Sequence, residues 1–514
     1  FGVGFYSAFM VADEITVRTK KYGSEQAYEW KSSGADGYTV TECDKETVGT
    51  EVIMHIKPDT DEENYSEYLE PYRLHALIKK YSDYIRYPIR MMMPEQKVKE
   101  GSDPEKPEFE TVEELKTVNS MVPLWQRKRS EVTDEEYNKF YSELTREFDK
   151  PQRTITVSAE GNVTYKALLF VPSARPFNFY TEGYEKGLQL YSAGVLIMDK
   201  CDSLLPDYLR FVRGVVDSPD LSLNISRELL QHDRQLKVIG QNLEKKIKAE
   251  LEKMMRDDRP KYETFWKNFG IHIKCGVCDE YGRFTDFLKD LLIFYTSEDS
   301  MRSLKEYVDA MPESQKAIYY ASADTVKHAM ALPQCEEVRS RGYEILYLDH
   351  PIDETVLQQL RMYEGKGFVN ILTEDLGFQT DEEKKAAEEK VVENKELLDF
   401  IRDSIGDEKL KQVTLSSKLV SSACCLTSTG GFTLEMEKYF RNGPSEEMRK
   451  LRADRVLELN AAHPACLAIK KAYDDGDKDR AAKLSKILYA QSELIAGVEI
   501  EDPTAYADLV CSLF

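Results

Sequence analysis

The chain opens on a glycine-containing turn whose spacing suits contact with a phosphate. Gly2 and Gly4 flank Val3, and the run from residue 4 to residue 12 is apolar on most sides and predicts a buried helix. Glycine lets the backbone turn tightly and approach a ligand, and the first N–H groups of a helix can bind an anion. Because most Gly-x-Gly turns are only turns, this spacing alone is a weak indication of phosphate binding.

A second stretch, residues 223–231, carries a cation in an unusual place. Asn224 and Ser226 are residue types that cap helices, which predicts a helix N-terminus here. Arg227 would lie in the first turn, on one face with Gln231, where the helix dipole disfavours a positive charge. These residues alone leave two interpretations open. Arg227 either pairs with a nearby carboxylate or meets an anion such as a phosphate.

Cysteines are the third candidate for chemistry. Cys275 and Cys278 form a Cys-x-x-Cys pair close to His272. Zinc needs four ligands, and the sequence has no second pair at a suitable spacing. A redox site would need a strand–turn–helix context. We therefore interpret this pair as loop cysteines, and the adjacent Cys424 and Cys425 as small buried residues.

Composition narrows the class of protein. The 514 residues include 70 Lys and Arg against 92 Asp and Glu, a net charge of −22, with 41% hydrophobic and 32% charged residues. This is a globular composition of about three domains, whose acidity disfavours binding to nucleic acid or to anionic membrane surfaces. No stretch of about 18 apolar residues predicts a membrane span. The nine scattered cysteines fit a reducing compartment, so we expect a cytoplasmic protein.

The sequence begins at Phe1, inside the Gly-x-Gly turn. Natural chains rarely start in the middle of a motif, so we expect a fragment that lacks its N-terminal part. A signal peptide would lie in that missing part, and the sequence is therefore silent about one.

The hydrophobic pattern predicts the elements around the first turn. Four stretches alternate apolar and polar residues as strands do: 15–19, 27–30, 38–41 and 48–56. Together with the first helix they form an α+β layer that looks incomplete. An amphipathic helix is expected over 74–86, before Pro88. Residues 94–114, with three prolines and many charges, read as a linker or surface loop.

Beyond residue 115 the pattern predicts mixed strands and helices. The expected strands are 165–171, 187–191 and 195–198, and the expected helices are 134–148 and 236–256. Residues 317–321 and 343–348 predict strands with a helical pattern between them, a βαβ-like unit. Trp125, among charged residues, is interpreted as part of a core. Residues 380–393 predict a solvated helical connector.

Two short amphipathic helices end the chain. Their apolar positions are Leu484, Ile487, Leu488 and Ile495 in the first, and Tyr506, Leu509, Val510 and Leu513 in the second. Gly497 ends the first helix, and Asp502 with Pro503 starts the second. The pattern leaves open whether these faces pack onto the same domain or against a second copy in a two-fold bundle.

Several motifs, in order along the chain, resemble the heat shock protein 90 family. They are FGVGFYSAF (1–9), GTE (49–51), LW (124–125), TDEEY (133–137), YLRFVRGVVDS (208–218) and LNISRE (223–228). The resemblance extends from residue 1 to the C-terminus and is weakest after about residue 375. The lack of a long acidic linker after the first domain, and of an acidic tail after residues 511–514, indicates the bacterial branch.

This resemblance implies an α+β, multidomain fold. Residues 1–95 would be the C-terminal part of a GHKL (Bergerat) ATP-binding α/β sandwich. Residues 96–376 would form an α/β middle domain that activates the ATPase and binds clients, and residues 395–514 a mostly helical dimerisation domain. The implied function is that of a molecular chaperone. It would be an ATP-driven homodimeric clamp, joined by its C-terminal helices, that remodels partly folded client proteins without binding nucleic acid or membrane.

The same motifs imply site residues. Those that would bind ATP are Gly2, Val3, Gly4 and Phe5, through backbone N–H groups, and Thr50, beside the adenine. Arg227 would reach the γ-phosphate, with Gln231 supporting it and Asn224 ordering the loop, which displaces the carboxylate-pair interpretation. The family's catalytic glutamate, Mg²⁺-binding asparagine and adenine-binding aspartate would precede Phe1. We therefore expect no metal ligand in this chain and no hydrolysis at a family-like rate, although the full-length parent would hydrolyse ATP.

Client contacts and competing functions complete the predictions. Candidate contacts are Trp125 and residues 415–439, where the apolar side chains are Leu419, Val420, Leu426, Phe432, Leu434 and Met436. The main alternative is a nucleotide-independent dimeric holdase or interaction scaffold. Another GHKL ATPase, such as a type II topoisomerase or mismatch-repair subunit, would favour a lysine loop and a basic groove. A redox or zinc protein would use Cys275 and Cys278.

Overall fold

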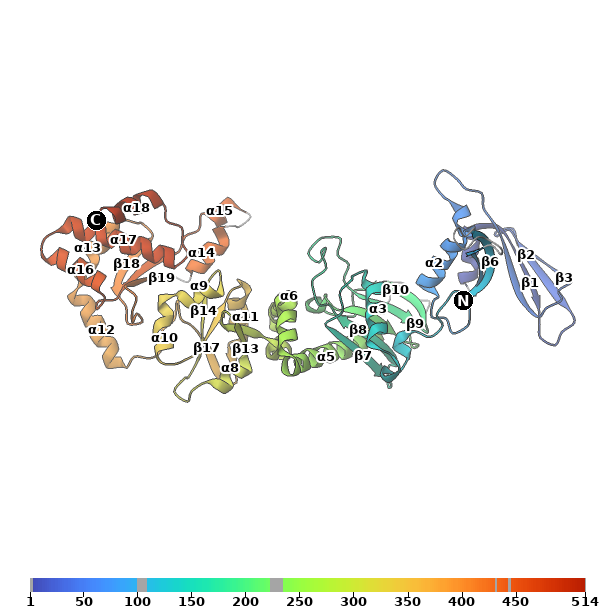
Figure 1. Ribbon diagram of the computed structural model, residues 1–514, viewed down its shortest axis with the longest axis horizontal. Helices are drawn as coiled ribbons and strands as arrows, with labels where there is room; N and C mark the ends of the chain where they lie inside the picture. Colours follow the sequence, from blue (N-terminus) through green and yellow to red (C-terminus); the bar gives the residue numbers. More distant parts are fainter. Residues whose placement is uncertain (1–2, 99–108, 222–233, 430–431, 442–444, 514) are drawn as a thin grey trace.

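The computed structural model describes residues 3–98, 109–221, 234–429, 432–441 and 445–513. The molecule is extended, with the first strands at one end and the C-terminal helices at the other (Figure 1). Sheets and helices alternate along its whole length, which confirms the predicted α+β class. None of the described helices is both long and apolar enough to cross a membrane.

The first segment is a helical turn on an antiparallel sheet. Helix α1 (Val3–Tyr6) continues as a 3-10 turn (Ser7–Met10), and the strands are β1 (Ala12–Lys20), β2 (Ala27–Ser32), β3 (Tyr38–Cys43) and β4 (Gly49–Ile56), in the order β3-β2-β1-β4. The four predicted strands are confirmed. The prediction of a buried helix is wrong, because Tyr6 and Met10 are 66% and 72% exposed. The described residues cover this short helix on one side only, where the Phe5 ring meets Trp30.

The next segment corrects two predictions. Helix α2 (Pro71–Tyr81) starts and ends earlier than expected, and residues 94–114 are not simply a loop. Strands β5 (Arg90–Val98) and β6 (Phe109–Thr117) form an antiparallel hairpin in which Pro94 stands opposite Glu113. A proline is tolerated there because a two-stranded ribbon has edges that need no ladder hydrogen bond. The expected domain boundary at residue 95 falls inside this hairpin.

The middle of the chain contains two sheets. The first follows α3 (Asp134–Thr145) and consists of β7 (Arg153–Ala159), β8 (Tyr165–Val171), β9 (Leu188–Ser192), β10 (Val195–Cys201) and β11 (Arg213–Asp217), in the order β10-β9-β11-β8-β7. Strand β11 runs parallel to β9 and antiparallel to β8. The three predicted strands of this region are confirmed as β8, β9 and β10.

The second sheet is six-stranded. Its strands are β12 (Ile293–Ser297), β13 (Ser300–Ser303), β14 (Ile318–Ser322), β15 (Ile345–Leu348), β16 (Met362–Tyr363) and β17 (Lys366–Asn370), in the order β13-β12-β15-β14-β17-β16. The helices of this part are α7 (Thr285–Leu288), α8 (Leu304–Ala310), α9 (Val326–Ala331), α10 (Glu336–Ser340) and α11 (Ile352–Leu360). Strands β14 and β15 are parallel and joined through α9 and α10, which confirms the predicted βαβ-like unit.

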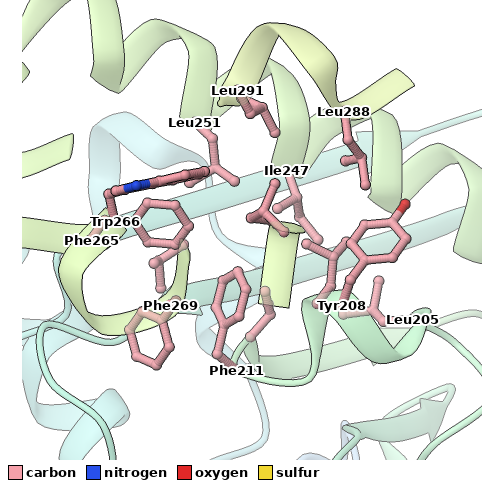
Figure 2. Close-up of a cluster of buried hydrophobic side chains, with 14 of the residues drawn as sticks. Leu205, Tyr208, Phe211, Ile247, Leu251, Phe265, Trp266, Phe269, Leu288 and Leu291 are labelled. Atoms are coloured by element: carbon pink, nitrogen blue, oxygen red, sulfur yellow. The ribbon is translucent and has the colours of Figure 1, made fainter. Parts of the chain in front are cut away.

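Two long helices connect the two sheets. Helices α5 (Arg234–Asp257) and α6 (Arg259–Cys278) lie between them in the molecule (Figure 1). Figure 2 shows side chains of α5 and α6, such as Leu251 and Phe269, packed with Tyr208 and Phe211, which precede β11. The same buried apolar cluster continues into β12, β14 and β15. The two sheets therefore share one core.

The C-terminal segment combines helices with a small sheet. Its elements are α12 (Asp381–Glu393), α13 (Lys395–Ile405), β18 (Leu410–Leu415), β19 (Cys424–Thr429), α14 (Leu434–Arg441), α15 (Glu446–Arg449), β20 (Asp454–Leu459), α16 (Pro464–Asp474), α17 (Lys478–Ile495) and α18 (Pro503–Cys511). Helix α12 has no buried residue, as expected of a solvated connector. The sheet, in the order β18-β20-β19, was not predicted.

Hydrogen bonds connect this C-terminal segment to the part of the chain that contains the six-stranded sheet. Glu336, at the start of α10, accepts five hydrogen bonds from the backbone N–H groups of residues 420–422 and the hydroxyls of Ser421 and Ser422. Gln334 donates to the Leu426 carbonyl. Burial raises the pKa of Glu336, but the five hydrogen bonds outweigh it and hold the pKa at about 2. The carboxylate is therefore ionised at neutral pH and fixes the segment before β19.

We predict that Glu336→Gln releases residues 420–422 at pH 7. The amide hydrogen-exchange protection of these three residues should fall roughly tenfold or more, because charge-assisted bonds are lost. The folded-state pKa lies below the ordinary 4.5. In the unsubstituted protein the same protection should therefore be complete above pH 4.5 and lost as the pH falls toward 2. Glu337→Gln is the control, since in the described part of the chain Glu337 pairs with Arg341, the residue that follows its own helix. Unchanged protection in Glu336→Gln would contradict this prediction.

Candidate nucleotide-facing site

The face of the first sheet that carries Thr50 is apolar. Register pairs Val17 with both Trp30 and Val52, and Thr19 with Thr50. Because directly opposed residues and residues two apart share a face, all five side chains lie on one side of the sheet. The opposite side holds charged side chains, including the Arg18–Glu29 and Lys31–Glu14 ion pairs.

Helix α1 lies on that apolar face. The Phe5 ring contacts Trp30 at 5.7 Å between centroids, which places α1 at the level of Val17. Thr50 is two residues further along the ladder, about 7 Å away along the strand. The structure therefore brings Gly4, Phe5 and Thr50 to one face. Gly2 and the side chain of Val3 lie outside the described residues.

Local contacts hold both parts of this site. The Ser7 hydroxyl donates to the Gly4 carbonyl at 2.6 Å, which closes the helical turn. The hydroxyls of Thr19 and Thr50 lie 2.9 Å apart. A threonine hydroxyl has one donor and two acceptor sites, so the exposed Thr50 keeps hydrogen-bonding capacity for a ligand.

The predicted Arg227, Gln231 and Asn224 fall outside the described residues. On the N-terminal side of this stretch, the Ser192 hydroxyl donates to the Leu221 carbonyl at 2.7 Å. On the C-terminal side, α5 starts and buries Leu236.

Trp125 contacts the end of strand β11. Its indole N–H donates to Oδ2 of Asp217, the last residue of β11, at 3.0 Å, and the Gln126 amide donates to the same oxygen at 3.0 Å. The rings of Tyr84 and Tyr191 pack against Trp125. Trp125 is buried, which confirms the core interpretation and excludes it as an exposed client contact.

The cysteine predictions have mixed outcomes. Cys275 and Cys278 lie in α6, so the loop interpretation is wrong: the apolar residues of this helix continue to its last turn. Burial raises the pKa of both thiols, which is opposite to the shift of a reactive cysteine. Within the described ranges no group of three His, Cys, Asp or Glu side chains could hold a metal ion. Cys424 and Cys425 are buried, as predicted.

Only some of the apolar side chains that were predicted as candidate client contacts are exposed in the structure. In residues 415–439, Leu419, Leu426 and Leu434 are buried, whereas Val420 and Met436 are exposed. Fully exposed aromatics that were missed include Phe148, after α3, and Phe177, between β8 and β9. The periodicity placed Phe148 at the end of the predicted helix 134–148, whereas α3 ends at Thr145, and Phe177 is a single aromatic in a loop without periodicity.

The terminal helices are incompletely covered. Helix α17 buries Ile487 and Leu488, whereas Leu494 and Ile495 at its end are exposed. Helix α18 has no buried residue, and its Leu509 and Val510 remain half-buried. The first of the two helices packs on its own domain, and the apolar face of the second is left open in the single chain.

Comparison with known proteins identifies the family. The family model described as Hsp90 protein matches residues 94–514. The chaperone protein HtpG of Bacillus subtilis (strain 168) is 49% identical over 514 residues, which are 100% of this chain and 81% of that protein. HtpG of Clostridium perfringens (strain 13 / Type A) is 48% identical and HtpG of Alkaliphilus oremlandii 47%, with the same coverage. The chain belongs to the Hsp90 family, and the predicted resemblance to its bacterial branch is confirmed.

Proposed function

We propose that this protein is a molecular chaperone that binds partly folded proteins. The observation that carries the proposal is the alignment of the whole chain with bacterial proteins named as chaperones, at close to half identity. Fully exposed aromatic side chains at Phe148 and Phe177 support it, because isolated apolar groups of this size are the surface that a partly folded protein can cover. The net charge of −22 agrees with a protein partner rather than a nucleic acid.

We further propose that ATP drives the protein as a dimeric clamp. The residues present fit part of such a site: α1 and Thr50 share one face, and Thr50 has free hydrogen-bonding capacity. Gly2, Val3, Gly4 and Phe5 would hold phosphates through backbone N–H groups, and Thr50 would contact the adenine. Bound ATP with Mg²⁺ supplies a phosphoryl group to water, and Arg227 would place its guanidinium at the γ-phosphate, with Gln231 and Asn224 positioning it. All nine cysteines are free thiols, which agrees with a cytoplasmic location.

The ATP proposal predicts a difference between two forms of the protein. The 514-residue chain should turn over ATP far more slowly than the full product of its gene, because the general base and the Mg²⁺ ligand are expected before residue 1. In the full product, Arg227→Ala should lower kcat about 100-fold and leave the Kd for ATP nearly unchanged, since a γ-phosphate contact acts on the transition state. Lys237→Ala, on exposed α5 surface, is the control. Turnover in the 514-residue chain that Arg227→Ala abolishes would contradict the expected absence of hydrolysis in this chain, and an unchanged kcat of Arg227→Ala in the full product would contradict the proposed role of Arg227.

Client binding is tested without nucleotide, which also tests the holdase alternative. The chain should suppress the aggregation of heat-denatured citrate synthase, measured by light scattering. Replacing both Phe148 and Phe177 with Ser should raise the concentration needed roughly tenfold, because two large apolar contacts are lost. Tyr22→Ser, at an 88% exposed aromatic on the β1–β2 turn, should have no effect. Equal losses in both variants would show that these aromatics are not the client surface.

The homodimer is proposed to form through α17 and α18. Sedimentation equilibrium should give twice the chain mass of 59.2 kDa. Leu509→Asp should weaken the dimer roughly 100-fold, because it places a charge in the apolar face of α18. Ala507→Asp, on the exposed side of the same helix, should leave the mass unchanged. A single-chain mass for the unsubstituted protein would contradict a C-terminal dimer.

A further inference from the structure

A small polar cavity lies beside the first middle sheet, away from the candidate nucleotide-facing end. Its volume is about 130 Å³, and its polar lining residues include Tyr141, Glu147, Gln189, Lys200 and Arg213. That volume corresponds to about four water molecules, enough for one carboxylate with its first contacts. Arg213 starts β11 and Asp217 ends it, so about 13 Å of strand separates the cavity lining from the end of β11.

Two cations line this cavity without a carboxylate partner. Lys200 makes no hydrogen bond and no ion pair with any residue in the described part of the chain. Arg213 donates to the Glu185 carbonyl at 3.0 Å and stacks on Tyr184, and within the same ranges no carboxylate lies within 4 Å of it. Burial lowers the pKa of Lys200, and the charge of Arg213 lowers it further. Like charges that face one cavity repel each other, and an anion between them would relieve that repulsion.

The other residues that line the cavity also favour an anionic ligand. Tyr141 is fully buried, and its hydroxyl has no hydrogen-bond partner among residues 3–98, 109–221 and the later described ranges. An unpartnered buried hydroxyl is costly and is readily satisfied by an acceptor in the cavity. Glu147 is the one acidic side chain among the lining residues, and it forms no ion pair with Lys200 or Arg213 at 4 Å or less. Burial raises the pKa of Glu147 and Arg213 lowers it in part, while Asp199 and Glu185 partly offset the lowered pKa of Lys200. In the described part of the chain, however, neither cation forms an ion pair at 4 Å or less that an incoming carboxylate would have to displace.

Two exposed aromatic residues adjoin the lining residues in the sequence. Phe148 follows the lining residue Glu147, and Phe177 lies between the lining residues Pro176 and Asn178; both are fully exposed. Gly214, also in the lining, has φ of +145°, and a Cβ there would stand 2.2 Å from the Leu168 carbonyl oxygen. The sheet backbone is thus closely packed at this part of the lining.

We propose that this cavity binds the carboxylate of an acidic side chain in a client segment whose flanking apolar residues contact Phe148 and Phe177. The inference rests on the proposed chaperone function and adds a preference to it. A glutamate or aspartate would lie between Lys200 and Arg213 and accept from the Tyr141 hydroxyl. A cation-lined cavity is an exception in a strongly acidic protein. The cavity favours client segments that contain both acidic and apolar residues over neutral segments.

The test compares two fluorescein-labelled peptides, Phe-Ser-Glu-Ser-Phe and Phe-Ser-Gln-Ser-Phe with blocked ends, by anisotropy on the full chain. The glutamate peptide should bind at least tenfold more tightly, and 0.5 M salt should reduce that ratio. Lys200→Gln should bring the ratio close to one, and Tyr141→Phe should lower it severalfold with the far-UV circular dichroism unchanged. Lys267→Gln, an exposed lysine of α6 without a partner in the described part of the chain, should preserve the ratio.

Equal affinity for the two peptides, absence of binding, or a ratio that Lys200→Gln leaves unchanged would overturn the proposal. A competition experiment distinguishes a client carboxylate from free phosphate as the bound anion. Acetate should displace the preference at lower concentration than inorganic phosphate, and the reverse order would assign the cavity to free phosphate instead. The chaperone proposal has its own readout, since a chain that still suppresses aggregation but binds both peptides equally loses this inference alone.

Discussion

Burial of α6 is the constraint on which the middle of the molecule depends. Tyr262, Phe265 and Phe269 lie on one face of this helix and are buried, and Figure 2 shows Phe265 and Phe269 packed near Leu251 of α5. Gly276 lets the Tyr208 ring approach, since a Cβ would stand 2.7 Å from it. A helix with a broad apolar face must bury that face against other elements. The buried cluster around α5 and α6 includes residues of both the five- and the six-stranded sheets, so the two sheets share one core.

The connection to the C-terminal segment has a different physical character. Glu336 joins α10 to residues 420–422 through charge-assisted hydrogen bonds, and Lys418 donates to the Glu374 carbonyl. Within the C-terminal segment, buried Arg455 pairs with Glu437 of α14 and Glu493 of α17. Ion pairs of this kind specify geometry, and removing one partner leaves a buried charge that costs several kcal/mol. The C-terminal helices are thus oriented by polar contacts, and the open apolar face of α18 keeps a defined direction.

The first sheet and the cation-lined cavity place the two proposed activities at separate sites. The apolar face with Thr50 and α1 lies at the N-terminal end of the molecule, whereas Lys200 and Arg213 lie beside β9 and β11. Trp125 links the two regions, because it contacts Tyr84 from the segment after α2 and binds Asp217 at the end of β11.

The sequence by itself determined the local elements and the family. Period-2 alternation identified β1 to β4, the βαβ pattern identified β14 and β15, and the motifs in order identified the Hsp90 family, because periodicity and short motifs are local properties of the chain. Tertiary structure decided the rest. Residues 94–114, whose described part belongs to the β5–β6 hairpin, are predicted as a linker because prolines and charges are local signals in a sequence. Strand pairing depends on residues that are not adjacent in the sequence, and it leaves no such signal. The exposure of α1, the burial of Trp125 and the helical setting of Cys275 each depend on which distant segment packs against them. The cavity between Lys200 and Arg213 also joins residues distant in sequence, because strand order brings them together and residue spacing carries no record of that order.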